Sequence, residues 1–335
     1  MQGCLVAAGA ASVGNLGCGA IGSLADDETN RKIAEVYKPR YVELEESGEL
    51  ERREKELWAM MESCRLCPRL CREERLNGDE GTCSTADTFK VASFGPHHGE
   101  ENPLRGRRGS GTIFFSNCNL LCVFCQNWEI GHRGEGRVTT HERLAEMMMV
   151  LQNQGCHNIN FVTPTHLVPH IVSALRIAAR RGLRVPTLYN TGGYDSLEVI
   201  KLLDGVIDVY LPDFKYQDAE IAARFSQDAP EYPEHAAAAI KEMHRQVGVL
   251  QTVDGVAYRG MIIRHLVLPE NLAATDEFVK WVVAELGPET HVNIMGQYRP
   301  MFQARNFPPL DRPVTRAEFE QAMQWARAAG LRNFH

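Results

Sequence analysis

The stretch Ser116-Asn117-Cys118-Asn119-Leu120-Leu121-Cys122-Val123-Phe124-Cys125-Gln126-Asn127-Trp128 spaces three cysteines as C-x3-C-x2-C. Thiolates gathered this closely favour a soft metal centre. A closed zinc site takes four ligands, whereas this stretch offers three cysteines and the nearest histidine is His132. Three thiolates suit an iron–sulfur cubane in which one iron is open to a small-molecule ligand. Zinc, or a set of structural thiols, is the alternative interpretation.

A second group of cysteines lies upstream. Cys64, Cys67, Cys71 and Cys83 follow a C-x2-C-x3-C-x11-C spacing in a loop interrupted by glycines. Four cysteines are the right number for a closed structural metal site. Zinc and a second iron–sulfur cluster fit this spacing equally well, and an unligated cysteine-rich loop is the alternative.

The composition bounds the class of protein. The 335 residues are 44% hydrophobic and 24% charged, which allows one large α/β domain and a small appendage. A net charge of -7 and a pI near 6.0 offer no basic surface, so we expect no nucleic-acid partner. Clustered cysteines indicate metal sites in a reducing compartment rather than disulfides, which predicts a cytoplasmic protein.

The first 25 residues form a distinct segment. They carry no charge and are rich in glycine and alanine, as in the apolar part of a signal peptide that lacks its basic start. They are too rich in glycine for a confident membrane span. Two hypotheses follow: a truncated export signal, in which case the protein is exported, or a disordered tail.

From residue 111 onward, short apolar segments alternate with helical patterns. Strands are expected at 111–116, 159–162, 185–189, 206–211, 261–268 and 291–295. Helices are expected at 140–154, 168–181, 196–203, 234–250, 275–286 and 315–329. This alternation predicts βαβ units and a parallel sheet. Six such units are too few for a complete eight-stranded barrel.

The segment before the strands has a different character. Residues 30–62 are strongly charged and place apolar side chains at helical spacing, with a break at Ser47-Gly48. We therefore predict three parts: an apolar segment at 1–29, a helical and cysteine-rich appendage at 30–90, and a core domain at 91–335.

Polar residues follow the second and third of these strands. In barrels of this kind, chemistry takes place at the carboxyl ends of the strands. Thr163 and Thr165 follow the second strand, and their hydroxyls can accept hydrogen bonds from a ligand. Asn190 and Gly192 follow the third, where paired glycines let the backbone approach a ligand closely. After the third strand, a turn before a helix is the alternative.

Charged residues mark the fourth and fifth strands. Asp213 and Lys215 are two residues apart at a strand end and so point to the same side. A surface ion pair is the alternative interpretation. Arg264 lies within an apolar strand, where a guanidinium is costly unless it is paired, and this favours a place in a site. Its planar fork suits a carboxylate.

The three-cysteine motif, with the aromatic Phe124 before its third cysteine, resembles the signature of the radical S-adenosylmethionine (SAM) superfamily. The resemblance implies a partial (β/α)6 TIM-type barrel. It also implies a [4Fe-4S] cluster bound by Cys118, Cys122 and Cys125, whose open iron is chelated by SAM. The implied cofactor-binding residues are Phe124, Thr163, Thr165, Asn190, Gly192, Asp213, Lys215 and Arg264.

Two further segments are similar to the pyruvate formate-lyase activating enzyme-like family. One is the Asp-x-Lys segment at Asp213, and the other is a partial Arg-x-x-x-Val-Pro-Gly segment at Arg264, in which Leu268 and Glu270 replace Val and Gly. The chain departs from the superfamily at Thr163-Pro164-Thr165, where a Gly-Gly-Glu-type segment usually binds the SAM amino group.

The resemblance implies an enzyme that reductively cleaves SAM to a 5′-deoxyadenosyl radical, which abstracts hydrogen from a substrate. The implied partners are an electron donor such as flavodoxin or ferredoxin and a glycyl-radical protein as substrate. One alternative is radical SAM modification of a small molecule or another protein. A second is a non-enzymatic iron–sulfur electron-transfer or metal-binding protein.

Overall fold

The computed structural model describes residues 27–335. Both hypotheses about the first 25 residues, the truncated signal and the disordered tail, lie outside the described residues. No helix within residues 27–335 has the length and apolar character needed to cross a membrane.

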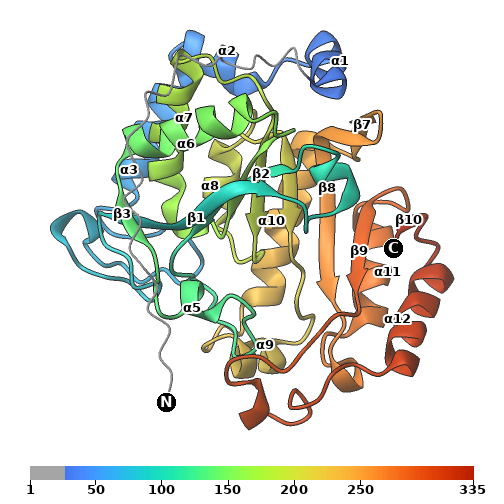
Figure 1. Cartoon of the computed structure of the whole chain (residues 1–335). Helices are drawn as coiled ribbons and strands as arrows, with labels where there is room; N and C mark the ends of the chain where they lie inside the picture. The colour runs from blue at the N-terminus through green and yellow to red at the C-terminus, as the bar shows by residue number, and fades with distance from the viewer. Residues whose placement is uncertain (1–26) are drawn as a thin grey trace, which may run out of the picture.

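A parallel sheet forms the centre of the molecule (Figure 1). Its six main strands are β2 (Ser110–Phe115), β4 (Ile159–Val162), β5 (Thr187–Thr191), β6 (Val209–Pro212), β8 (Val256–Leu266) and β9 (His291–Met295), and each is parallel to the next. The two edge strands of the sheet do not pair with each other, so the barrel is open. The predicted α/β fold with a partial (β/α)6 barrel is confirmed.

Four further strands complete the sheet. They are β1 (Phe89–His97), β3 (Arg137–Thr139), β7 (Gln251–Val253) and β10 (Asn333–Phe334). Strand β1 pairs antiparallel with both β2 and β3, and β10 extends the opposite edge beside β9. None of these four was predicted from the sequence.

Helices follow the strands and cover the sheet. They are α6 (His141–Asn153), α7 (Val168–Arg180), α8 (Leu197–Leu202), α9 (Ala219–Phe225), α10 (Tyr232–Val247), α11 (Thr275–Glu285) and α12 (Arg316–Ala329). Single turns occur at α4 (Asn102–Arg105), α5 (Trp128–Gly131) and the 3-10 segments Arg75–Asn77, Thr165–Leu167, Pro269–Asn271 and Ala304–Asn306.

Local sequence explains where the long helices begin. Thr140 caps α6 by accepting a hydrogen bond from the Arg143 N–H at 3.2 Å. Thr315 and Glu318 form a reciprocal capping box at the start of α12. The strands between the helices are buried on both faces, as expected for a parallel sheet.

Three helices of the appendage precede the sheet: α1 (Glu28–Val36), α2 (Arg40–Glu46) and α3 (Glu49–Ala59). The break between α2 and α3 lies at the predicted position, where Gly48 adopts a φ of 79° that favours glycine. Helix α3 packs against α7, and Arg176 of α7 pairs with Glu45, Glu51 and Glu54. The appendage is thereby fastened to the barrel.

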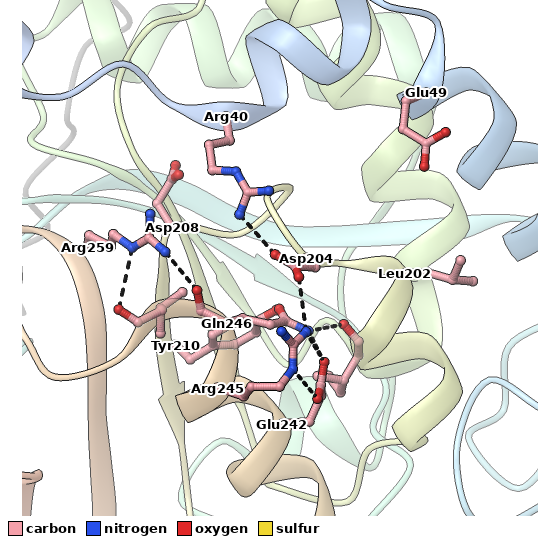
Figure 2. A network of polar contacts seen from close by, with 12 residues as sticks. Arg40, Glu49, Leu202, Asp204, Asp208, Tyr210, Glu242, Arg245, Gln246 and Arg259 are labelled. Carbon is pink, nitrogen blue, oxygen red and sulfur yellow. Dashed lines mark hydrogen bonds and ion pairs between the residues drawn. The ribbon is translucent and has the colours of Figure 1, made fainter.

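A polar network fastens the appendage at a second place (Figure 2). Arg40 of α2 donates to Asp204 at 3.0 Å, and Asp204 also accepts from Arg245 of α10 at 3.0 Å. Arg245 in turn pairs with Glu242 at 2.7 Å. Asp204 lies in the turn that leads into β6. The network therefore lies at the end of the barrel where the strands begin, away from the carboxyl ends of the strands.

Candidate active site at the carboxyl ends of the strands

A cavity of about 310 Å³ lies at the carboxyl ends of the parallel strands. Its lining includes the predicted residues Cys118, Cys122, Phe124, Cys125, Thr163, Asn190, Gly192, Asp213, Lys215 and Arg264. These residues come from the loop after β2 and from the ends of β4, β5, β6 and β8. Strand ends that are distant in sequence therefore meet around one cavity, as a barrel predicts.

The loop after β2 carries the three cysteines. Asn117 and Leu121 adopt left-handed φ angles of 71° and 56°, which turn the chain tightly around the sulfurs. The Sγ of Cys118 accepts a hydrogen bond from the Leu120 N–H at 3.4 Å. The Sγ of Cys122 lies 3.2 Å from the Ser226 hydroxyl. The loop thus holds its sulfurs toward the cavity without a disulfide among residues 27–335.

The protonation of these thiols depends on positive charge. Burial raises the pKa of Cys118 and Cys122, and burial together with the two neighbouring cysteines raises the pKa of Cys125 to about 12. Lys215 opposes the increase at Cys122. Cationic iron supplies the charge that makes thiolates favourable here, because a bound metal deprotonates its thiol ligands. The three sulfurs therefore fit an iron–sulfur cluster.

The distances between the three cysteine sulfurs also indicate which kind of metal centre they can hold. Within residues 27–335, no three His, Cys, Asp or Glu side chains converge closely enough to hold one metal ion. A cubane does not require that convergence, because each cysteine binds a different iron. The predicted alternative of a closed zinc site is consequently less well matched by these three cysteines.

Three charged side chains form a compact cluster beside the cysteines. Asp213 accepts from Lys215 Nζ at 2.6 Å and from Arg264 Nε at 2.8 Å. Arg264 also donates to Asn190 Oδ1 at 2.6 Å. The guanidinium is therefore paired, and the alternative of an isolated surface ion pair for Asp213 and Lys215 does not describe this largely buried cluster.

Opposing effects set the charges of the cluster. Burial alone raises the pKa of Asp213, but Arg264 and Lys215 outweigh it and hold that pKa below its usual value. Burial disfavours the ammonium of Lys215, yet Asp213 and Cys122 raise its pKa. All three groups thus stay charged at neutral pH, with an excess of positive charge facing the cavity.

Two glutamates behind the cluster were missed by sequence reasoning. Glu100 lies 3.9 Å from Arg264 and accepts from Asn160 at 3.1 Å, and its neighbour Glu101 accepts from Asn293 at 2.9 Å. Burial raises the pKa of Glu100. The adjacent acidic pair was the available signal, but it gained meaning only once β1 was known to place it inside the barrel.

The two threonines after β4 have different places. Thr163 lines the cavity and has a φ of 59°, a strained conformation for a β-branched residue. Thr165 is not among the residues that line the cavity, and its role as a cofactor-binding residue stays a prediction. Thr165 is buried and donates to Asp195 Oδ1 at 2.7 Å, and Thr191 donates to Asp195 Oδ2 at 2.6 Å. This small network fixes the ends of β4 and β5.

The turn after β5 approaches β6 closely. Gly193 has a φ of 82°, and a Cβ at this position would lie 2.2 Å from the carbonyl oxygen of Asp213. Only glycine fits there, so the turn brings Gly192 against the cavity while keeping contact with β6. On another side, Met295 and Gln297 at the end of β9 complete the lining.

Comparisons with known proteins indicate the family of the chain. Residues 112–282 match the family model for the radical SAM superfamily, which is about half of the chain. A protein of Methanocaldococcus jannaschii, "Uncharacterized protein MJ0674", is 30% identical over 280 residues, covering 81% of this chain and 76% of that protein.

Two solved structures show limited structural similarity to the chain. The structure of TYW1 with a bound lysine-pyruvate adduct covers 65% of this chain and 73% of its own, with 12% identity and a TM-score of 0.42. Streptococcus suis SuiB covers 66% of this chain and 47% of its own, also with 12% identity and a TM-score of 0.42. The chain belongs to the radical SAM superfamily. Membership implies a [4Fe-4S] cluster, SAM and an enzyme that cleaves it.

Proposed function

We propose that this enzyme binds its cluster through Cys118, Cys122 and Cys125 and uses SAM to generate a radical on a glycine of a partner protein, as in the pyruvate formate-lyase activating enzyme-like family. The observation that carries this is the meeting of the cysteine loop with Asp213, Lys215 and Arg264 in one cavity. Bound there, the cluster supplies an electron that breaks the C5′–S bond of SAM.

The side chains of this chain bind and orient the cofactor. Lys215 and Arg264 make the cavity positive and attract the carboxylate of SAM. Asp213 holds both cations in place and leaves the remaining donors of the Lys215 ammonium free. Asn190 and Glu100 fix the guanidinium from behind, so its position is set before SAM arrives.

The chemistry of the reaction requires an external electron. We propose a flavodoxin or ferredoxin as the donor and a cytoplasmic location. Leu120, Cys122 and Phe124 are buried and line the cavity, and the apolar side chains limit water at the centre, which protects a reactive radical. The cofactors we propose also include a second iron–sulfur cluster or zinc at the appendage.

A second candidate function has its own support. The segment after β4 lacks the Gly-Gly-Glu pattern, and the appendage carries a cysteine group of its own. Both departures favour a radical SAM enzyme that modifies a small molecule or another kind of protein residue. Superfamily membership places the non-enzymatic alternative behind these two.

The test is anaerobic reconstitution with iron and sulfide, followed by reduction, addition of SAM and chromatography for 5′-deoxyadenosine. The buried thiol Cys156 lies outside both cysteine groups, so Cys156→Ala is the matched control for Cys122→Ala. Product formed by the control and absent from Cys122→Ala supports the reaction. Electron paramagnetic resonance of candidate partner proteins then separates glycyl-radical formation from the second function.

A further inference from the structure

The four cysteines of the appendage lie around a second, smaller cavity. Its lining consists of Cys64, Leu66, Cys67, Arg69, Cys71, Arg75, Thr82, Cys83 and His166. Three of the cysteines are buried, and Cys71 is half-buried. The Sγ of Cys71 would lie 2.8 Å from a Cβ at Gly81, so the missing side chain makes room for the sulfur.

Hydrogen bonds fold the appendage loop around these cysteines. The N–H of Cys64 donates to the carbonyl oxygen of Glu73 at 3.0 Å, and the N–H of Arg72 donates to the carbonyl oxygen of Cys64 at 3.1 Å. The hydroxyl of Thr85 donates to the carbonyl oxygen of Cys83 at 3.0 Å. These bonds help to bring the four cysteines to one cavity.

An unbalanced charge provides the strongest reason to expect a ligand. Arg75 is completely buried, and no carboxylate within residues 27–335 lies within ion-pair distance of it. Its guanidinium donates to the carbonyls of Ala86 and His166, and Nη1 lies 3.8 Å from Cys64 Sγ. A buried guanidinium remains protonated and is costly without a negative partner. Thiolates around a metal supply that negative charge.

The same cavity touches the loop of the first cysteine group. His166 lines it, and burial lowers the pKa of this imidazole to about 3, so the ring is neutral. Its Nε2 contacts the carbonyl of Ser116 at 3.0 Å and must be the donor, while its buried Nδ1 has no partner among the described residues. Arg69, which also lines this cavity, donates from Nε to the carbonyl oxygen of Asn119, beside Cys118, at 3.0 Å.

We propose that Cys64, Cys67, Cys71 and Cys83 bind a second, closed thiolate-ligated metal centre, and that Arg75 is its buried counter-cation. Zinc and an iron–sulfur cluster both satisfy this charge requirement. The small cavity and the lack of a preformed single-ion site within residues 27–335 leave the choice between zinc and a cluster to metal analysis. Four ligands leave no open position, and the centre is therefore independent of SAM cleavage.

The experiment isolates the second centre in the full chain. The triple variant Cys118→Ala/Cys122→Ala/Cys125→Ala retains only the appendage group, and its zinc, iron and sulfide are measured after anaerobic purification. We expect about one centre per chain. Zinc without sulfide identifies a mononuclear site, and iron with matching sulfide identifies a cluster. A triple variant that holds neither metal overturns the proposal.

A reciprocal variant protects the test against misfolding. Cys67→Ser/Cys83→Ser should lose the second metal while keeping the iron of the first cluster and its SAM-dependent resonance spectrum. Failure of SAM cleavage with the second metal intact would count against the proposed reaction alone. Retention of the full metal content in this double variant would contradict the second centre.

The role of Arg75 has its own readout. In the triple variant, Arg75→Met should lose the metal to a chelator at roughly tenfold lower concentration, in line with other outer contacts of metal sites. Arg75→Lys keeps the charge and should restore most of the retention. A merely structural arginine would destabilise the metal-free and metal-bound proteins equally, so melting temperatures with and without chelator decide between the two roles.

Discussion

The two cysteine groups are neighbours, yet they are built in different ways. The loop group (Cys118, Cys122 and Cys125) offers three sulfurs to a cavity of about 310 Å³. The appendage group (Cys64, Cys67, Cys71 and Cys83) surrounds a small cavity with four sulfurs. In both groups a nearby N–H donates a hydrogen bond to sulfur, from Leu120 to Cys118 and from Arg75 to Cys64. Ligand number and open space therefore separate a site for chemistry from a site that is closed.

The positively charged side chains beside the two groups also differ in whether they have a carboxylate partner. Lys215 and Arg264 at the loop group share the carboxylate of Asp213, whereas Arg75 at the appendage has no carboxylate partner. A paired cation can remain in place while SAM enters and leaves. An unpaired buried cation needs a permanent anion, and a resident metal–thiolate centre provides one.

We expect the largest difference between the two groups when one sulfur of the loop group is removed. Cys122→Ala leaves two thiolates, which cannot hold a cubane with one open iron, so 5′-deoxyadenosine should fall to background. Chromatography after anaerobic turnover measures this. The metal of the appendage should survive the substitution, and its loss would mean that the two centres do not form separately.

Asp213→Ala should make the cations of the loop group resemble Arg75. Lys215 would lose its carboxylate partner and Arg264 would keep only the more distant Glu100, both in a largely buried place, which costs about 3–5 kcal/mol of unfolding free energy. Denaturant unfolding measures the cost. The exposed pair Arg316–Glu320 provides a control, because Glu320→Ala should cost less than about 0.5 kcal/mol.

The Asp213 effect should also depend on pH. The folded protein holds the pKa of Asp213 below its ordinary value, so the carboxylate contributes its full stability above about pH 4. That contribution is lost as the pH falls further toward the folded pKa. The difference between wild type and Asp213→Ala should therefore shrink only in strong acid, and a difference that disappears already near pH 6 would contradict this pairing.

Sequence reasoning predicted the barrel because its strands are short, apolar and separated by capped helices. The existence of the six parallel strands and the break at Gly48 were predicted correctly, but several strand starts were not: β5 begins later than expected at Thr187, β6 later at Val209 and β8 earlier at Val256. Strand β1 was missed because its Gly95-Pro96 pair suggests a loop, and it tolerates these residues near the edge of the sheet.

The site was predictable where one motif or one strand end decides it. Asp213 and Arg264 could each be placed at a strand end, but their mutual hydrogen bond depends on β6 and β8 being adjacent. Glu100 reaches the cluster from the loop after β1, and Arg75 gains its importance only from burial. Contacts of this kind depend on tertiary packing and leave no local pattern.

Arg264→Lys tests whether the paired cation of the loop group acts in binding SAM. Lysine keeps the charge but cannot contact both Asp213 and Asn190 through a planar fork. We expect the KM for SAM to rise about tenfold, corresponding to the loss of one charged hydrogen bond. Steady-state formation of 5′-deoxyadenosine measures it, and a fall in kcat at unchanged KM would instead place Arg264 in the chemical step.

The smallest expected effect concerns the strained backbone of the open site. Thr163 has a φ of 59° at the position where the superfamily pattern has glycine, so Thr163→Gly should relieve strain and change stability by less than about 1 kcal/mol. Thr252→Gly in strand β7 is the matched control and should lose about 1 kcal/mol, because its strand loses a favourable β-branched residue. If both variants lose equally, the Thr163 side chain stabilises the fold by contacts that outweigh its strain. If Thr163→Gly is tolerated and still binds SAM, the site requires only the left-handed backbone conformation at this position, which glycine and this threonine both adopt.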